Sequence, residues 1–147
     1  MSTPIYYVDA FTDKLFSGNP AAVIFSQIKD EQLMQKIAAE NNLSETAFIR
    51  EENGIFHIRW FAPLCEIDLC GHATLASAYI FFKYIKPESS MFEVQSLKNG
   101  ILKVTKKNNL LVLDFPKDSL SQYNEFSLIE EIININPIEL YKGRADV

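Results

Sequence analysis

The stretch that decides the fold is Glu66–Ala78, EIDLCGHATLASA, in which a polar approach runs through a Cys-Gly-His step into an apolar segment. Over residues 73–82 the side chains are small or hydrophobic, and Thr74 and Ser77 supply the only aliphatic hydroxyls. A helix without a polar face is buried inside a fold rather than laid on its surface. The segment therefore predicts a buried central helix, about 18 Å long, with the other elements arranged as walls around it.

The start of this predicted helix is the first candidate ligand site. Its first turn leaves backbone N–H groups unpaired at the positive end of the helix dipole, which suits a carboxylate or a developing negative charge. Gly71 would let a ligand approach the backbone there. His72 adds a titratable donor or acceptor, and the dipole disfavours its imidazolium form. The alternative for His72 is a structural cap.

Size and composition exclude several classes of protein. The 147 residues are 48% hydrophobic and 22% charged, which indicates one soluble globular domain. A net charge of −5 without any basic stripe argues against nucleic acid. The apolar run is too short to span a membrane, and the first residues lack the features of a secretory signal. Cys65 and Cys70 form no disulfide framework, so we expect free thiols and a cytoplasmic location.

The order of the predicted elements indicates an α+β fold. We expect strands over residues 5–11, 21–25, 44–49, 55–61, 91–97, 101–105, 110–115 and 138–141, and helices over 31–40 and 127–133. Asn-Gly pairs at 53–54 and 99–100 mark hairpin turns. No linker or internal repeat is visible. The prediction is a curled, barrel-like, mostly antiparallel sheet around one buried helix.

Glu45 is a candidate proton carrier because it stands among apolar residues at the start of a predicted strand. A carboxylate that has lost solvent is a better proton shuttle near neutral pH. On the local pattern alone, an exposed glutamate at a strand end is the favoured interpretation.

Cys70 allows two interpretations. A thiol beside a helix N-terminus has a lowered pKa and serves as an acid or base, whereas a small buried cysteine is inert packing. The spacing of Cys65, Cys70 and His72 matches no common zinc pattern, so we expect no metal. No phosphate-binding glycine loop and no serine-hydrolase motif is present, so we expect no nucleotide cofactor.

Five ordered blocks resemble one known family: Val8–Phe11, Gly18–Val23, Asn42–Phe48, Arg59–Pro63 and Asp68–Thr74. Together they are similar to the first half of the phenazine-biosynthesis PhzF-like family, within the diaminopimelate-epimerase fold. The resemblance covers residues 8–78, and beyond residue 90 only the strand pattern agrees. It implies two similar lobes, each a curled sheet around a central helix, with the active site in the cleft between them.

The same resemblance implies a cofactor-independent isomerase that shifts a proton on a small acidic metabolite. The family's catalytic glutamate falls on Glu45 and its assisting histidine on His72. The residues implied to bind substrate are Asn19, Ser44, Cys70, Gly71 and Ala73.

Two departures from the family keep alternatives open. Cys70 stands where racemases and epimerases of this fold carry one of two catalytic thiols, but the chain offers no second one. The sequence also stops about where the family crosses into its second lobe, so we expect a single N-terminal lobe, truncated or half-length, that self-associates as a homodimer. The alternatives are a non-catalytic binding or regulatory module for small acids, and a thiol-based racemase or epimerase that uses Cys70.

Overall fold

A computed structural model describes residues 2–124 and 126–143, and the chain divides into two compact units, Met1–Phe115 and Pro116–Val147. The first unit contains the central helix and the large sheet, and the second contains a short helix and two short strands. No change in composition marks the boundary at Phe115, which is why the sequence predicts no division there. The two units are described separately.

One mixed sheet forms most of the first unit. Its strands are β1 (Tyr6–Ala10), β2 (Asn19–Phe25), β3 (Glu45–Glu52), β4 (Ile55–Phe61), β5 (Glu66–Ile67), β6 (Met91–Ser96), β7 (Gly100–Lys107) and β8 (Leu110–Asp114). They follow the order β1-β2-β3-β4-β6-β7-β8, with β5 paired to β4. The pairs β2/β3 and β4/β6 are parallel, and the other pairs of this sheet are antiparallel. The predicted mostly antiparallel sheet is confirmed, and helical crossovers account for its two parallel pairs.

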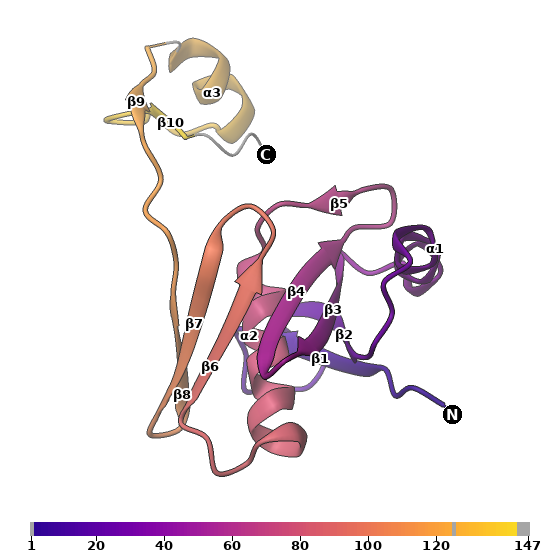
Figure 1. The fold of residues 1–147 in the computed structure, drawn as a ribbon. Helices are drawn as coiled ribbons and strands as arrows, with labels where there is room; N and C mark the ends of the chain where they lie inside the picture. Colours follow the sequence, from indigo (N-terminus) through magenta and orange to yellow (C-terminus); the bar gives the residue numbers. More distant parts are fainter. Residues whose placement is uncertain (1, 125, 144–147) are drawn as a thin grey trace. The chain divides into compact units, whose positions relative to one another are not determined.

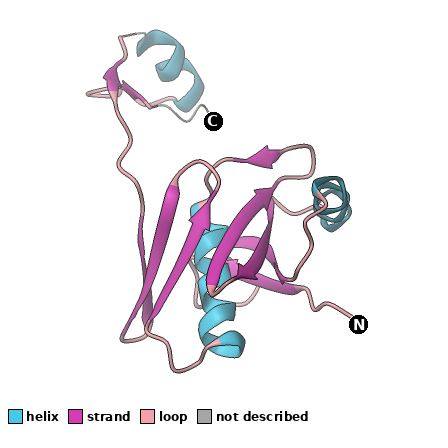
Figure 2. Ribbon diagram, viewed as in Figure 1, coloured by secondary structure: helices cyan, strands magenta, loops and turns pink. Residues whose placement is uncertain are grey.

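The central helix α2 (Gly71–Ile80) lies inside the curl of this sheet, as Figures 1 and 2 show. It continues into a π-helical turn, η1 (Phe81–Ile85). It contacts β1, β2 and β3 toward one edge of the sheet and β8 at the other edge. Gly71 and Leu75 are half-buried and Tyr79 is exposed, and these three form one narrow stripe of the helix. The other residues of α2 are buried: His72, Ala73, Thr74, Ala76, Ser77, Ala78 and Ile80. The predicted buried helix in a curled sheet is confirmed.

The two hydroxyl groups inside α2 do not disturb this apolar setting. The Thr74 hydroxyl donates to the carbonyl of Cys70, and the Ser77 hydroxyl donates to the carbonyl of Ala73 at 2.7 Å. Each hydroxyl therefore uses a backbone acceptor one turn earlier in its own helix. Because these two hydroxyl groups are satisfied within the helix, the sheet around them needs to supply only apolar contacts.

Aromatic side chains fill the far end of the core. The ring of Phe81 lies 4.5 Å from that of Phe92 and 5.3 Å from that of Phe56, measured between centroids. Rings at these separations add favourable contact energy to the burial of their surface.

Trp60, the single tryptophan of the chain, is 2% exposed, and its Nε1 has no hydrogen-bond partner within the described residues.

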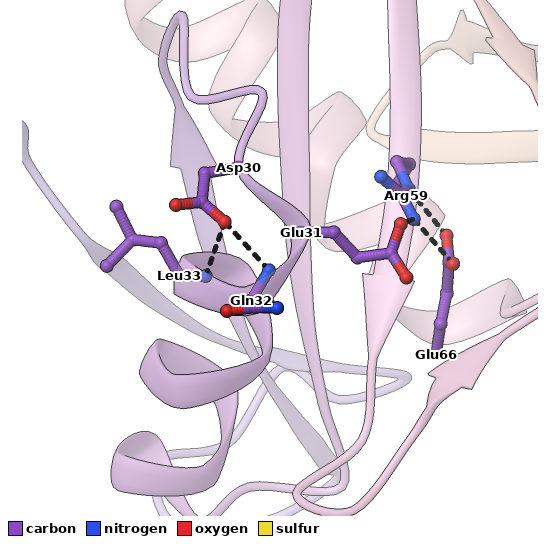
Figure 3. Close-up of polar contacts among 6 residues, drawn as sticks. All are labelled: Asp30, Glu31, Gln32, Leu33, Arg59 and Glu66. Carbon is purple, nitrogen blue, oxygen red and sulfur yellow. Dashed lines mark hydrogen bonds and ion pairs between the residues drawn. The ribbon is translucent and has the colours of Figure 1, made fainter.

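The helix α1 (Glu31–Asn41) covers the outer face of the sheet, where Met34 and Ala38 join a second apolar cluster. The Asp30 carboxylate accepts hydrogen bonds from the backbone N–H groups of Gln32 and Leu33 at the helix start (Figure 3). Beside this cap, the Arg59 guanidinium bridges the carboxylates of Glu31 and Glu66. The predicted capped helix is confirmed.

The second unit contains β9 (Ser121–Gln122), α3 (Phe126–Ile133) and β10 (Tyr141–Lys142), with β9 and β10 antiparallel. The predicted helix over residues 127–133 is confirmed. The strand predicted over residues 138–141 is mostly wrong, because only Tyr141 of that range belongs to β10. The short strands β5 and β9 were missed, since two residues carry no periodic pattern. Among the described residues, no helix is long and apolar enough to cross a membrane.

We expect the Asp30→Ala variant to lose about 1 kcal/mol of unfolding free energy, because two N–H groups of α1 lose their acceptor. Urea denaturation followed by circular dichroism measures this loss. The Asp30→Asn variant keeps a side-chain oxygen at the cap and should lose much less. Equal stability of the alanine variant and the unchanged chain would contradict the assigned role of the cap.

Candidate functional site

Three segments bring the candidate residues together at one end of the first unit. β2 and β3 are parallel and pair Ala21 with Glu45, so both strands begin at the same end of the sheet. Asn19 is the first residue of β2, Glu45 is the first of β3, and His72 is the second residue of α2. The buried helix thus presents its N-terminus to the starts of two parallel strands.

Glu45 and His72 are in direct contact. A carboxylate oxygen of Glu45, Oε2, lies 3.0 Å from Nε2 of His72, and the two side chains are only 18% and 9% exposed. The exposed glutamate favoured by the local pattern is therefore wrong. The sequence around Glu45 could not show this, because the imidazole that covers the carboxylate belongs to a helix much later in the chain.

The Glu45 carboxylate keeps unused acceptor capacity. Its Oε2 is buried and makes no aligned hydrogen bond within the described part of the chain, although Nε2 of His72 is close. An oxygen can lie 3.0 Å from Nε2 without accepting a hydrogen bond when it lies off the axis of the ring N–H, and this accounts for both the short distance and the missing hydrogen bond. A buried carboxylate oxygen with a free lone pair is poised to accept a proton from another molecule.

Ser44 occupies the other position next to Nε2 of His72. Its hydroxyl oxygen lies 3.2 Å from Nε2, and the hydroxyl also reaches the carbonyl of Pro20 at 3.1 Å and Oδ1 of Asn19 at 3.3 Å. Asn19 and Ser44 therefore lie at the same site as Glu45 and His72. The Pro20 carbonyl was not identified from the sequence, since a backbone acceptor carries no side-chain signal.

Asn19 is held in place by the residue before it. Gly18 has a φ of +85°, and a Cβ there would come 2.3 Å from the carbonyl oxygen of Ala10. Only glycine fits this position without strain. The Gly-Asn-Pro turn signal in the sequence thus corresponds to a backbone conformation that sets the start of β2.

Cys70 is a neighbour of both the His72 imidazole and the Glu45 carboxylate, with donor atoms of the three residues within 4.8 Å of one another. Its Sγ is 3.4 Å from Nδ1 of His72, and the residue is 6% exposed. The pKa of the Cys70 thiol is raised to about 12, mainly by burial and in part by the nearby Glu45 carboxylate, while the backbone N–H groups of Ala73 and His72 lower it by less. The lowered pKa considered from the helix N-terminus alone is wrong, because desolvation outweighs the dipole here.

The helix start itself is partly covered. Ala73 is fully buried, and a side chain added at Gly71 would come 2.9 Å from the ring of Phe115. The ring of Phe115 thus occupies space beside Gly71, where the sequence alone predicts that a ligand approaches the backbone. Cys70 is the N-cap residue. Its carbonyl accepts from the N–H of Thr74 and the N–H of Ala73 faces its sulfur, so only part of the first turn is open to a ligand.

Among the residues that the structure describes, one set could coordinate a metal ion: donor atoms of Glu45, Cys70 and His72 all lie within 4.8 Å of one another. Cys65, one of the three residues whose spacing matches no zinc pattern, is exposed and lies outside this set. In the present arrangement the thiol faces Nδ1 and the carboxylate faces Nε2 of one ring.

The fold and the site define an α+β lobe in which a carboxylate and an imidazole meet at the start of a buried helix. The chain belongs to the PhzC-PhzF family of phenazine biosynthesis-like proteins, whose sequence model matches residues 8–136.

Curated relatives and solved structures agree with this assignment. A protein of Halalkalibacterium halodurans named an uncharacterized isomerase is 42% identical over 99% of this chain and 56% of its own length. The human phenazine biosynthesis-like domain-containing protein is 46% identical over 79% of this chain and 43% of its own length. A crystal structure of a PhzF-family protein from Enterococcus faecalis superposes with a TM-score of 0.87 at 44% identity, covering 98% of this chain and 55% of that one. The chain spans about half the length of these relatives.

We expect Cys70 to resist alkylation. With a pKa of about 12, about one thiol in 10,000 is ionised at pH 8, compared with about a quarter for an ordinary cysteine. Iodoacetamide should therefore modify Cys70, in a Cys65→Ser variant, at least about 1,000-fold more slowly than free cysteine, with the rate still rising above pH 10. Mass spectrometry against time and pH measures the rate.

The matched control is the Cys70→Ser variant, whose remaining thiol is the exposed Cys65. It should be modified rapidly under the same conditions. Rapid modification of Cys70 at pH 7 would show an ionised thiol and would revive the thiol-based racemase.

Proposed function

We propose that this chain forms the lobe of a cofactor-independent isomerase that carries the proton-transfer residue and moves a proton on a small carboxylic acid metabolite. The observation that carries the proposal is the buried Glu45 Oε2, which has an unused lone pair and lies 3.0 Å from His72 Nε2. The membership of the PhzC-PhzF family, with relatives named isomerases, supports it.

Glu45 is the proposed proton carrier. Its carboxylate removes a proton from a substrate carbon, so that a C–H bond breaks, an O–H bond forms and the electron pair moves into the adjacent unsaturated system. The same carboxyl group then returns the proton to another carbon of that system. Atoms and electrons balance without any redox partner, and a carboxylate with little exposure to water suits both steps.

The helix start and His72 are proposed to hold the negative charge of the substrate. Backbone N–H groups of the first turn of α2 face the same end of the unit as His72, and the helix dipole adds a positive potential there. A substrate carboxylate on these groups places the adjacent carbon near Glu45. Asn19 and Ser44 complete the polar side of this site.

The alternatives make different demands on the same residues. A thiol-based racemase needs an ionised Cys70, which the raised pKa disfavours. A non-catalytic binding module needs the helix start but not the carboxylate of Glu45. Because the chain spans about half the length of its relatives, the activity of the whole protein belongs to the proposal.

Isotope exchange in deuterium oxide tests the proposal. The purified protein is incubated with a panel of small unsaturated and amino acids, and incorporation of deuterium at carbon is followed by proton NMR. We expect exchange that falls 100-fold or more in the Glu45→Gln variant, about the contribution of one general acid–base group, while ligand binding measured by calorimetry persists.

The control is Glu51→Gln, a change at an exposed glutamate of the same strand. It should leave exchange unaltered. Exchange that survives in Glu45→Gln would overturn the assignment of Glu45, and binding of acids without any exchange would favour the binding module.

A further inference from the structure

The position of the proton on His72 can be assigned from the atoms around its ring. His72 has a different polar neighbour at each nitrogen: the Cys70 thiol at Nδ1, and Glu45 with Ser44 at Nε2. A neutral imidazole donates through one nitrogen and accepts through the other. The hydrogen-bonding capacity of these neighbours decides which nitrogen carries the proton.

The neighbours of Nε2 require a proton there. A carboxylate oxygen of Glu45 lies 3.0 Å away, and two bare lone pairs at this separation would repel each other. The Ser44 hydroxyl has one hydrogen, and the Pro20 carbonyl at 3.1 Å can only accept it. With that hydrogen directed to Pro20, the Ser44 oxygen is free to accept from Nε2. Both neighbours of Nε2 are thus acceptors.

The neighbour of Nδ1 supplies a donor. Cys70 is 6% exposed and its Sγ lies 3.4 Å from Nδ1. Burial of the sulfur keeps the group in its thiol form, so that its S–H can donate to Nδ1. The Glu45 carboxylate is a second acceptor near this S–H, and an Nδ1 that accepts the hydrogen carries no proton of its own.

We infer that Cys70 and Ser44 are positioning residues that hold His72 as a neutral imidazole with its proton on Nε2. His72 is then a hydrogen-bond donor to negative charge in the site and not a base, which leaves Glu45 as the base. The tautomer follows from the contacts alone, whereas its use toward a substrate rests on the proposed function.

This arrangement gives Cys70 a role that needs no ionised sulfur. Loss of the thiol removes the donor at Nδ1 without touching Nε2, so that the ring can rotate or exchange its proton between the two nitrogens. A serine at position 70 keeps a donor hydroxyl and should preserve the tautomer, while an alanine should not.

Nitrogen-15 NMR of the protein labelled at histidine tests the inference. Long-range correlations from the ring protons distinguish a protonated, pyrrole-type nitrogen from an unprotonated, pyridine-type nitrogen. At pH 7 we expect Nε2 of His72 to be pyrrole-type and Nδ1 to be pyridine-type. His57, the only other histidine of the chain, lies on β4 and is an internal reference assigned with the His57→Gln variant.

The variants test the part played by Cys70. Cys70→Ser should retain the two separate nitrogen shifts of His72, and Cys70→Ala should move both shifts toward a common averaged value. Cys65→Ser, at the exposed cysteine, should change neither. The amide spectrum of each variant shows whether it is folded, and Cys70→Val replaces Cys70→Ala if the latter unfolds.

A proton on Nδ1, averaged shifts or an imidazolium ring in the unchanged protein at pH 7 would overturn the tautomer. Shifts that stay separate in a folded Cys70→Ala variant would overturn the role of Cys70. The measurement needs no turnover. Absence of isotope exchange together with the expected nitrogen shifts would therefore overturn the proposed function and leave this inference standing.

Discussion

Burial of most of α2 is the constraint on which the rest of the first unit depends. A helix with apolar side chains on every side cannot lie on a flat sheet, because one of its faces would remain in water. The sheet encloses α2 by curling around it, so that β1, β2 and β3 cover one side of the helix and β8 contacts the other side. Thr74 and Ser77 fit into this environment because each bonds to the backbone of its own helix.

The site is a consequence of the same packing. A buried helix has its N-terminus inside the fold, where the dipole is less screened than at a surface. The parallel pairing of β2 with β3 brings Asn19 and Glu45 to that terminus from positions far apart in the sequence. The carboxylate is consequently kept from water by the imidazole next to it.

The sequence predicted the buried helix, the capped helix over residues 31–40 and most strands, because each of these has a periodic pattern or a turn signal. It predicted Glu45 and His72 as partners only through resemblance, since no local pattern encodes a contact between a strand start and a helix start. The raised pKa of Cys70 and the ring of Phe115 over Gly71 depend on burial and packing in three dimensions. Such features follow from the folded arrangement and have no signature along the chain.

Trp60 gives this architecture an intrinsic optical probe. It is the single tryptophan, it is almost completely removed from solvent in the cluster that surrounds α2, and its indole N–H has no partner within the described residues. The indole should therefore emit at short wavelength while the helix remains enclosed, and shift to longer wavelength once water enters the curl. Its emission spectrum thus reports on the enclosure of α2 without any added label.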